Sequence, residues 1–196
     1  MLDLDSKAVE ELLSALGAHL ADEGHSFAIV VVGGSTLALR GWVERTTRDV
    51  DVIARAFQEE GQWVLVAPDP LPGPLVVAIE RVARDYGLPQ DWLNTTIGAQ
   101  WDFGLPGGFA EDLEWRRYGT LDVGFAGRRS LIALKLYAAV DRGPTSVHFQ
   151  DLLALAPSDS ELDTAAAWVV TQDAAELLPD LVRDVVDAAR RTPRER

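Results

Sequence analysis

The alternation of apolar and polar positions predicts that the first part of the chain mixes helices and strands. Residues 6–23 carry apolar side chains at the helical period, with Ser6 as the expected N-cap and Gly24 as the stop. Residues 27–32 form an apolar run without a polar break, which is typical of a strand buried on both faces.

Shorter patterns predict further strands and helices in this part of the chain. Residues 49–53 alternate acidic and aliphatic side chains, which predicts a half-buried strand. The other expected elements are a short helix over 36–43, a strand over 62–67, a helix over 75–86, loops with short strands over 88–112, and two strands over 113–118 and 120–125.

After Gly127 the pattern becomes almost purely helical. We expect helices over 129–141, 146–156, 159–171 and 173–191. The chain is therefore predicted to have an α/β (α+β) fold. A small mixed-sheet core over 1–127 precedes a helical segment over 128–196, which we expect to pack on the core and contribute to its site.

Composition is that of an ordinary globular protein. Of 196 residues, 47% are hydrophobic and 25% are charged, and there is no cysteine to form disulfides. The longest apolar stretches, 27–32 and 131–134, are far too short to cross a membrane. The first residues are acidic, unlike a signal peptide. We therefore expect a cytoplasmic protein that does not bind membranes.

The net charge of −13 narrows the range of partners. Thirty-one acidic residues against eighteen basic ones disfavour a surface that tracks duplex DNA. A local basic site for a nucleotide, or for the end of an RNA, is compatible with this charge. The acidic surface also suits a cationic small-molecule acceptor. Only Lys7 and Lys135 are lysines.

Three features of the first part follow one another in an order that suggests a site: a glycine turn, the segment Arg45-Thr46-Thr47, and a pair of aspartates directly after it. Gly33, Gly34 and Ser35 end a buried strand at the start of a helix, where free backbone N–H groups can bind phosphate and glycine permits close approach. Asp49 and Asp51 stand two residues apart in a strand, so both carboxylates project from one face. A pair of carboxylates suits Mg²⁺, which prefers oxygen ligands.

Each feature also has a purely structural interpretation. Gly-Gly-Ser is a common junction between a strand and a helix, and Asp-Val-Asp is typical of the solvent side of an edge strand. Together, in the order strand, turn, helix and strand, they favour a functional site.

The segments VGGSTLALR (32–40) and RTTRDVDV (45–52) resemble the signature of the nucleotidyltransferase (polymerase-β-like) superfamily. The closer resemblance is to bacterial nucleotidyltransferase-like proteins related to the toxins of type IV abortive-infection toxin–antitoxin systems. It continues in the helical part at LKLYAA (134–139) and DLLAL (151–155).

The resemblance implies a Mg²⁺-dependent transfer of a nucleoside monophosphate from a nucleoside triphosphate to a hydroxyl of an RNA or a protein. The turn 33–35 would hold the triphosphate, Asp49 and Asp51 the Mg²⁺, and Lys135 and Asp151 would complete the catalytic set. A cognate antitoxin or other partner protein is a further expectation. The alternative is a catalytically silent module of the same fold: an antitoxin, a regulator or a nucleotide sensor.

Lys135 also stands out without the resemblance. It lies in a predicted helix that is apolar nearly all round, so its ammonium must reach water along its stem or meet an anion. Asp151 opens an apolar run, and taken alone it is typical of solvated surface. A pairing with Lys135, together with the resemblance, leaves a functional role equally open.

Three points remain open in the sequence. Asp122 is an alternative to Asp151 as a third carboxylate, with Asp102 a weaker choice. Residues 92–94 either line a nucleotide pocket or pack in the core. Val147 and His148 occupy the places where the toxins usually have a basic–acid pair, and this departure leaves the acceptor undetermined.

Overall fold

Helix α1 (Ser6–Asp22) opens the folded chain and follows the predicted apolar period. Its cap is Asp5 rather than the expected Ser6, because the Asp5 carboxylate accepts a hydrogen bond from the Ala8 N–H at 2.7 Å. The helix ends two residues before the expected stop at Gly24. Its apolar stripe is fully buried: Val9, Leu12, Leu13, Leu16 and Leu20.

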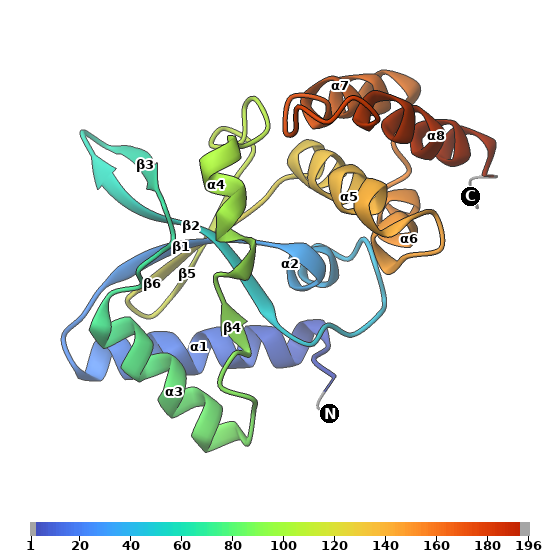
Figure 1. The fold of residues 1–196 in the computed structure, drawn as a ribbon. Coiled ribbons are helices and arrows are strands. Elements are labelled where there is room, and N and C mark those ends of the chain that lie inside the picture. Colours follow the sequence, from blue (N-terminus) through green and yellow to red (C-terminus); the bar gives the residue numbers. More distant parts are fainter. Residues whose placement is uncertain (1–2, 193–196) are drawn as a thin grey trace. The chain divides into compact units, whose positions relative to one another are not determined.

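The computed structural model describes residues 3–192, which form two compact units (Figure 1). The first, the sheet unit, comprises residues up to 102 together with 113–126. The second, the helical unit, comprises 103–112 and the residues from 127 onward. The segment 103–112 thus lies with the helices rather than in the core where the sequence placed it.

The sheet unit is built on a mixed sheet, so the predicted α/β class is confirmed. Strand order is β3-β2-β1-β6-β5, with β4 added beside β2. β1 pairs antiparallel with β2 and parallel with β6. The strands are β1 (Phe27–Val32), β2 (Val50–Glu59), β3 (Gln62–Val66), β4 (Leu93–Asn94), β5 (Glu114–Tyr118) and β6 (Leu121–Phe125).

One face of the sheet carries the main core. Helices α1 and α3 (Gly73–Tyr86) lie along this face (Figure 1). Alternate strand residues such as Ile29, Val31 and Val123 pack into the same apolar cluster as these helices. Burying large aliphatic side chains from both layers is the main force that holds the helices on the sheet.

Two predicted boundaries in this unit differ from the observed ones. β2 continues six residues beyond 53 because it pairs along its length with β3 in a hairpin. The short helix α2 (Gly33–Leu39) begins at the glycines themselves rather than after them. Between α3 and β5 the chain forms β4, a 3₁₀ turn (Thr96–Ala99) and the short helix α4 (Gln100–Phe103).

The helical unit contains α5 (Arg128–Arg142), α6 (Val147–Ala154), α7 (Asp159–Val169) and α8 (Leu178–Arg191). All four were predicted, although the last begins five residues later than expected. Within the described residues, no helix is long and apolar enough to cross a membrane.

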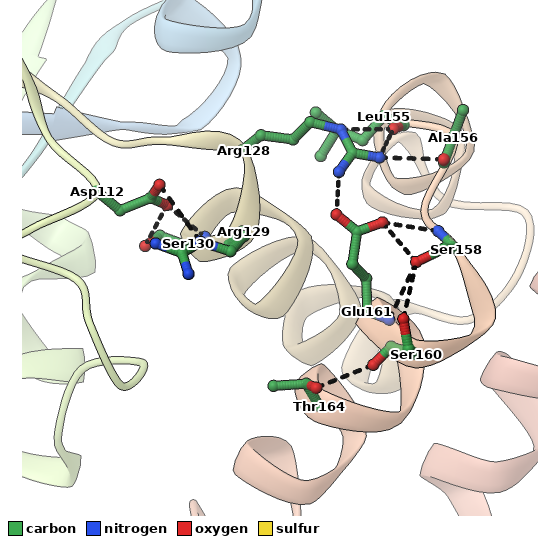
Figure 2. Close-up of polar contacts among 10 residues, drawn as sticks. All are labelled: Asp112, Arg128, Arg129, Ser130, Leu155, Ala156, Ser158, Ser160, Glu161 and Thr164. Carbon is green, nitrogen blue, oxygen red and sulfur yellow. Dashed lines mark hydrogen bonds and ion pairs between the residues drawn. The ribbon is translucent and has the colours of Figure 1, made fainter.

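Polar contacts tie α5 to α7 in this unit (Figure 2). The Arg128 guanidinium donates to the carbonyls of Leu155 and Ala156 and pairs with the Glu161 carboxylate. Glu161 also closes a capping box with Ser158 at the start of α7. Burial raises the pKa of Glu161, but the hydrogen bonds from Ser158 and Arg128 outweigh it and lower that pKa below its usual value.

Candidate functional site

The two predicted metal ligands stand at the start of β2. Asp49 directly precedes the strand and Asp51 is its second residue. Both are partly exposed, whereas Val50 and Val52 are completely buried in the core cluster. The alternation predicted for this segment is confirmed, because the period of two sends neighbouring side chains to opposite faces of the sheet.

The glycine turn meets the carboxylate of Asp51. Asp51 pairs with Val32, the last residue of β1, which places it beside Gly33. Gly33 has φ +80°, and a Cβ atom there would collide with Asp51 Oδ2 and lie 3.2 Å from its Cγ. The left-handed backbone conformation favours glycine at this position, and a side chain there would also force the Asp51 carboxylate to move. The structure therefore brings together two features that the sequence separates by more than fifteen residues.

The second glycine contacts the segment that leads to the acids. A Cβ atom on Gly34 would lie 2.9 Å from Thr47 Oγ1 and 3.3 Å from Arg45 Nη2. Thr47 is held by two backbone hydrogen bonds with Leu4, and its hydroxyl donates to the Asp49 carbonyl at 3.2 Å. The guanidinium of Arg45 thus lies beside the glycine turn. Sequence reasoning noted this arginine but gave it no role; its closeness to the acids was the available signal.

Ser35 lies inside α2 rather than at its cap. Its side chain is 1% exposed and its hydroxyl donates to the Val32 carbonyl at 3.2 Å. The helix starts after Val32, without a side-chain cap. In this arrangement Ser35 holds the turn, and its contact with a nucleotide stays a prediction.

Asn94 flanks the carboxylates from a neighbouring strand. β4 runs parallel to β2 with Asn94 opposite Asp51, and Asn94 Nδ2 donates a long hydrogen bond of 3.5 Å to Asp49 Oδ2. The Asn94 Oδ1 accepts from the Thr96 N–H at 2.9 Å, which fixes the amide orientation. Of residues 92–94, the one that reaches the site is Asn94, whereas Trp92 is buried in the core.

The carboxylates of Asp49 and Asp51 fit the type of Mg²⁺ site in which the protein and a phosphate substrate both supply ligands. Asp49 and Asp51 offer hard carboxylate oxygens two residues apart, and Mg²⁺ in phosphate-transferring sites takes one or two carboxylates and completes its octahedron with phosphates and water. Within residues 3–192 no group of three or more metal-ligating side chains forms a complete protein cage. Asp49 and Asp51 are the residues that would hold such an ion.

Asp122 lies at the opposite end of the sheet from the carboxylate pair. It stands opposite Ala28 in β1, whereas Asp51 stands opposite Val32. These two positions are four residues apart on one strand, or about 13 Å. Asp122 instead pairs with Arg117, at 3.5 Å from its Nε. This register argues against Asp122 as the third carboxylate.

Lys135 and Asp151 form a buried ion pair in the helical unit. Lys135 Nζ lies 2.8 Å from Asp151 Oδ2, and the two side chains are 7% and 1% exposed. Of the two alternatives that the sequence left open for the Lys135 ammonium, the structure shows the contact with an anion. Asp151, which taken alone would be solvated surface, is instead buried because α6 turns it inward onto α5, and it pairs with Lys135. Any contribution of the pair to chemistry stays a prediction.

Comparison with protein-family models, curated proteins and solved structures finds no match for this chain.

Proposed function

We propose that the protein is a Mg²⁺-dependent nucleotidyltransferase that moves a nucleoside monophosphate from a nucleoside triphosphate onto a hydroxyl of an RNA or a protein. The observation that carries the proposal is the contact between Gly33 and the Asp51 carboxylate. It joins a glycine turn able to admit phosphate oxygens to a carboxylate pair able to hold Mg²⁺.

Each residue of the site has a task in this chemistry. Asp49 and Asp51 hold the metal, and Asn94 orients Asp49 through its amide. The Arg45 guanidinium and the backbone at 33 and 34 bind the phosphates. When bound, Mg²⁺ neutralises the charge that develops on the phosphates. The acceptor oxygen forms a bond to the α-phosphorus, the bond from that phosphorus to the bridging oxygen breaks, and pyrophosphate leaves while the hydroxyl proton passes to water.

Lys135 and Asp151 enter the proposal through the resemblance alone. Lys135 Nζ lies 2.8 Å from Asp151 Oδ2, and both side chains are buried. We propose a catalytic role for the Lys135 ammonium, with Asp151 holding it in position. A cognate antitoxin or other partner protein is likewise a proposal from the resemblance.

The direct test is a transfer assay. The four α-labelled ribonucleoside triphosphates are incubated with Mg²⁺, the purified chain, and either total bacterial RNA or a protein extract. Wild type should release pyrophosphate and label one acceptor class, whereas Asp49→Asn and Asp51→Asn should lose at least about 100-fold in rate, the scale of losing one electrostatic stabiliser. The control is Glu59→Gln, an exposed carboxylate at the far end of the same strand.

Two outcomes would overturn the proposal. Labelling that survives in both aspartate variants would show that the site is not the one described. Mg²⁺-dependent nucleotide binding without transfer to any acceptor would instead indicate a catalytically silent module.

A further inference from the structure

A cavity lies between α5 and α7, and all of its lining residues belong to the helical unit. The two helices supply most of the lining, and Pro106 and Gly107 complete it. This space, here the α5–α7 cavity, has a volume of about 200 Å³. An engineered protein cavity of about 150 Å³ holds benzene. The α5–α7 cavity is therefore large enough for a ligand that consists of one ring and a short chain.

Beyond the first turn of each helix the lining of the α5–α7 cavity is apolar. Ile132 and Ala133 line it from α5 and Ala165 lines it from α7, and each is at most 4% exposed. Trp168, three residues after Ala165, also lines the cavity. Its ring meets the edge of Tyr137, with centroids 6.0 Å apart and an angle of 68° between the planes. An indole held in this way beside small apolar side chains favours an aromatic ring in the ligand.

Two charged residues line the cavity, one in the first turn of each helix. They are Arg129 of α5 and Glu161 of α7 (Figure 2). The Glu161 carboxylate already accepts hydrogen bonds from the N–H and O–H groups of Ser158 and pairs with Arg128. Because these donors compensate its charge, Glu161 offers little to a cationic ligand.

The Arg129 guanidinium is open to a ligand. Its side chain is 71% exposed, and its Nε lies 3.7 Å from Asp112 Oδ1, which is too far for a hydrogen bond. Asp112 Oδ2 instead accepts from the N–H and O–H groups of Ser130, at 3.1 and 3.0 Å. In the part of the chain that the structure describes, the Nη groups of Arg129 have no hydrogen-bond partner. Two such N–H groups favour a carboxylate, which can accept from both at once.

Helical spacing places the guanidinium and the apolar lining along one cavity. Arg129 and Ile132 are three residues apart on α5, so they share a face of that helix. Glu161, Ala165 and Trp168 follow one another at intervals of four and three residues on α7, and they share the facing side of that helix. A ligand can therefore contact Arg129 at one end and the apolar lining at the other.

We propose that the α5–α7 cavity binds a small aromatic carboxylate. The ring lies among Ile132, Ala165 and Trp168, and the carboxylate accepts hydrogen bonds from the Arg129 guanidinium. The site selects for a ring and a carboxylate in one molecule, because the apolar lining removes the ring from water and Arg129 compensates the negative charge.

This binding is independent of the proposed nucleotidyl transfer. The α5–α7 cavity lies in the helical unit, whereas Asp49 and Asp51 belong to the sheet unit. The binding requires neither Mg²⁺ nor a nucleotide, so it can be measured with both absent.

The test is calorimetric titration of the full chain in EDTA with benzoate, phenylacetate and 3-phenylpropionate. The amide of each acid probes the ring without the charge, and acetate probes the carboxylate without the ring. We expect one-to-one binding of at least one of the three acids. The matching amide and acetate should each bind at least about tenfold more weakly.

Variants assign the binding to the cavity. Arg129→Gln should weaken the best acid about tenfold and leave the binding of its amide unchanged, because only the acid pairs with the guanidinium. Trp168→Leu should weaken the acid by removing the ring surface. The matched control is Arg142→Gln, since Arg142 is 70% exposed on the same helix and also pairs with an aspartate. It should bind the acid like wild type, and so should Asp51→Asn.

Several results would each overturn the proposal. They are absence of binding by all three acids, equal binding by the matching amide or by acetate, and unchanged binding of the acid in Arg129→Gln. An equal loss in Arg129→Gln and Arg142→Gln would show that the acid responds to the net charge of the chain rather than to the cavity.

Discussion

The carboxylate of Asp51 occupies the space that a side chain on Gly33 would need. The contact follows from the register of β1 and β2, which sets Asp51 opposite the residue before the glycine turn. Because Gly33 has no side chain, the Asp51 carboxylate can lie against the backbone of the turn.

Replacement of Gly33 by alanine should be strongly destabilising. A Cβ atom there meets Asp51 Oδ2 and also imposes a side chain on a residue at φ +80°. We expect a loss of about 2–4 kcal/mol in the free energy of unfolding, measured by urea titration. Gly61→Ala is the matched control, since Gly61 has φ +79° with nothing within 4 Å of an added Cβ. It should cost only about 1 kcal/mol; equal losses would contradict the contact.

Asp51→Asn should abolish stabilisation by Mg²⁺ and nucleotide together. A ligand at 100 times its dissociation constant adds about 2.7 kcal/mol, or a rise of about 2–4 °C in Tm for a chain of this length. Wild type should show this rise with at least one nucleoside triphosphate only when Mg²⁺ is present. Glu59→Gln should respond like wild type. A Mg²⁺-dependent rise that persists in Asp51→Asn would rule out this carboxylate as a ligand.

Lys135→Met should destabilise the helical unit. The change leaves the Asp151 carboxylate buried without its ammonium partner, at a cost of about 3–5 kcal/mol in the free energy of unfolding. The double variant Lys135→Met with Asp151→Leu should recover most of that loss, because an apolar pair replaces two buried charges. Lys7→Met, at the other, exposed lysine, is the control. If all three variants unfold at the same urea concentration, the pair has no energetic role.

The ion-paired Glu161 should make the helical unit acid-sensitive. Its pKa is lowered in the folded chain, so its contribution to stability is present above its unfolded pKa of about 4.5 and is lost as pH falls through the lower folded value. Glu161→Gln should cost about 1–2 kcal/mol at pH 7 by urea titration. The difference from wild type should shrink steadily below about pH 4.5.

The control for this pH series is Glu176→Gln, an exposed carboxylate of the same unit. It should remain within about 0.5 kcal/mol of wild type at every pH. A Glu161 effect that is constant from pH 7 to pH 3 would mean that side-chain packing, rather than the charge, stabilises the start of α7.

Much of the fold could be predicted from the local periodicity of apolar and polar residues in the sequence. The apolar stripe of α1, the buried run of β1, the alternation at Asp49 and Asp51, and the four helices after residue 127 were all predicted, because each depends on side-chain spacing within one element. The sequence also showed that the Lys135 ammonium must either reach water along its stem or meet an anion, because it lies on an apolar helix, but it left the choice between the two open.

Only the tertiary structure shows which residues from distant segments lie close together, because residue spacing along the chain does not encode strand register or helix packing. The pairing of β1 with β2 set Asp51 against Gly33, while the pairing of β1 with β6 carried Asp122 to the other end of the sheet. β4 brought Asn94 to Asp49, and the packing of α6 buried Asp151 against Lys135. These relationships depend on strand register and helix packing between distant segments, which are settled by the burial of the whole core rather than by neighbouring residues.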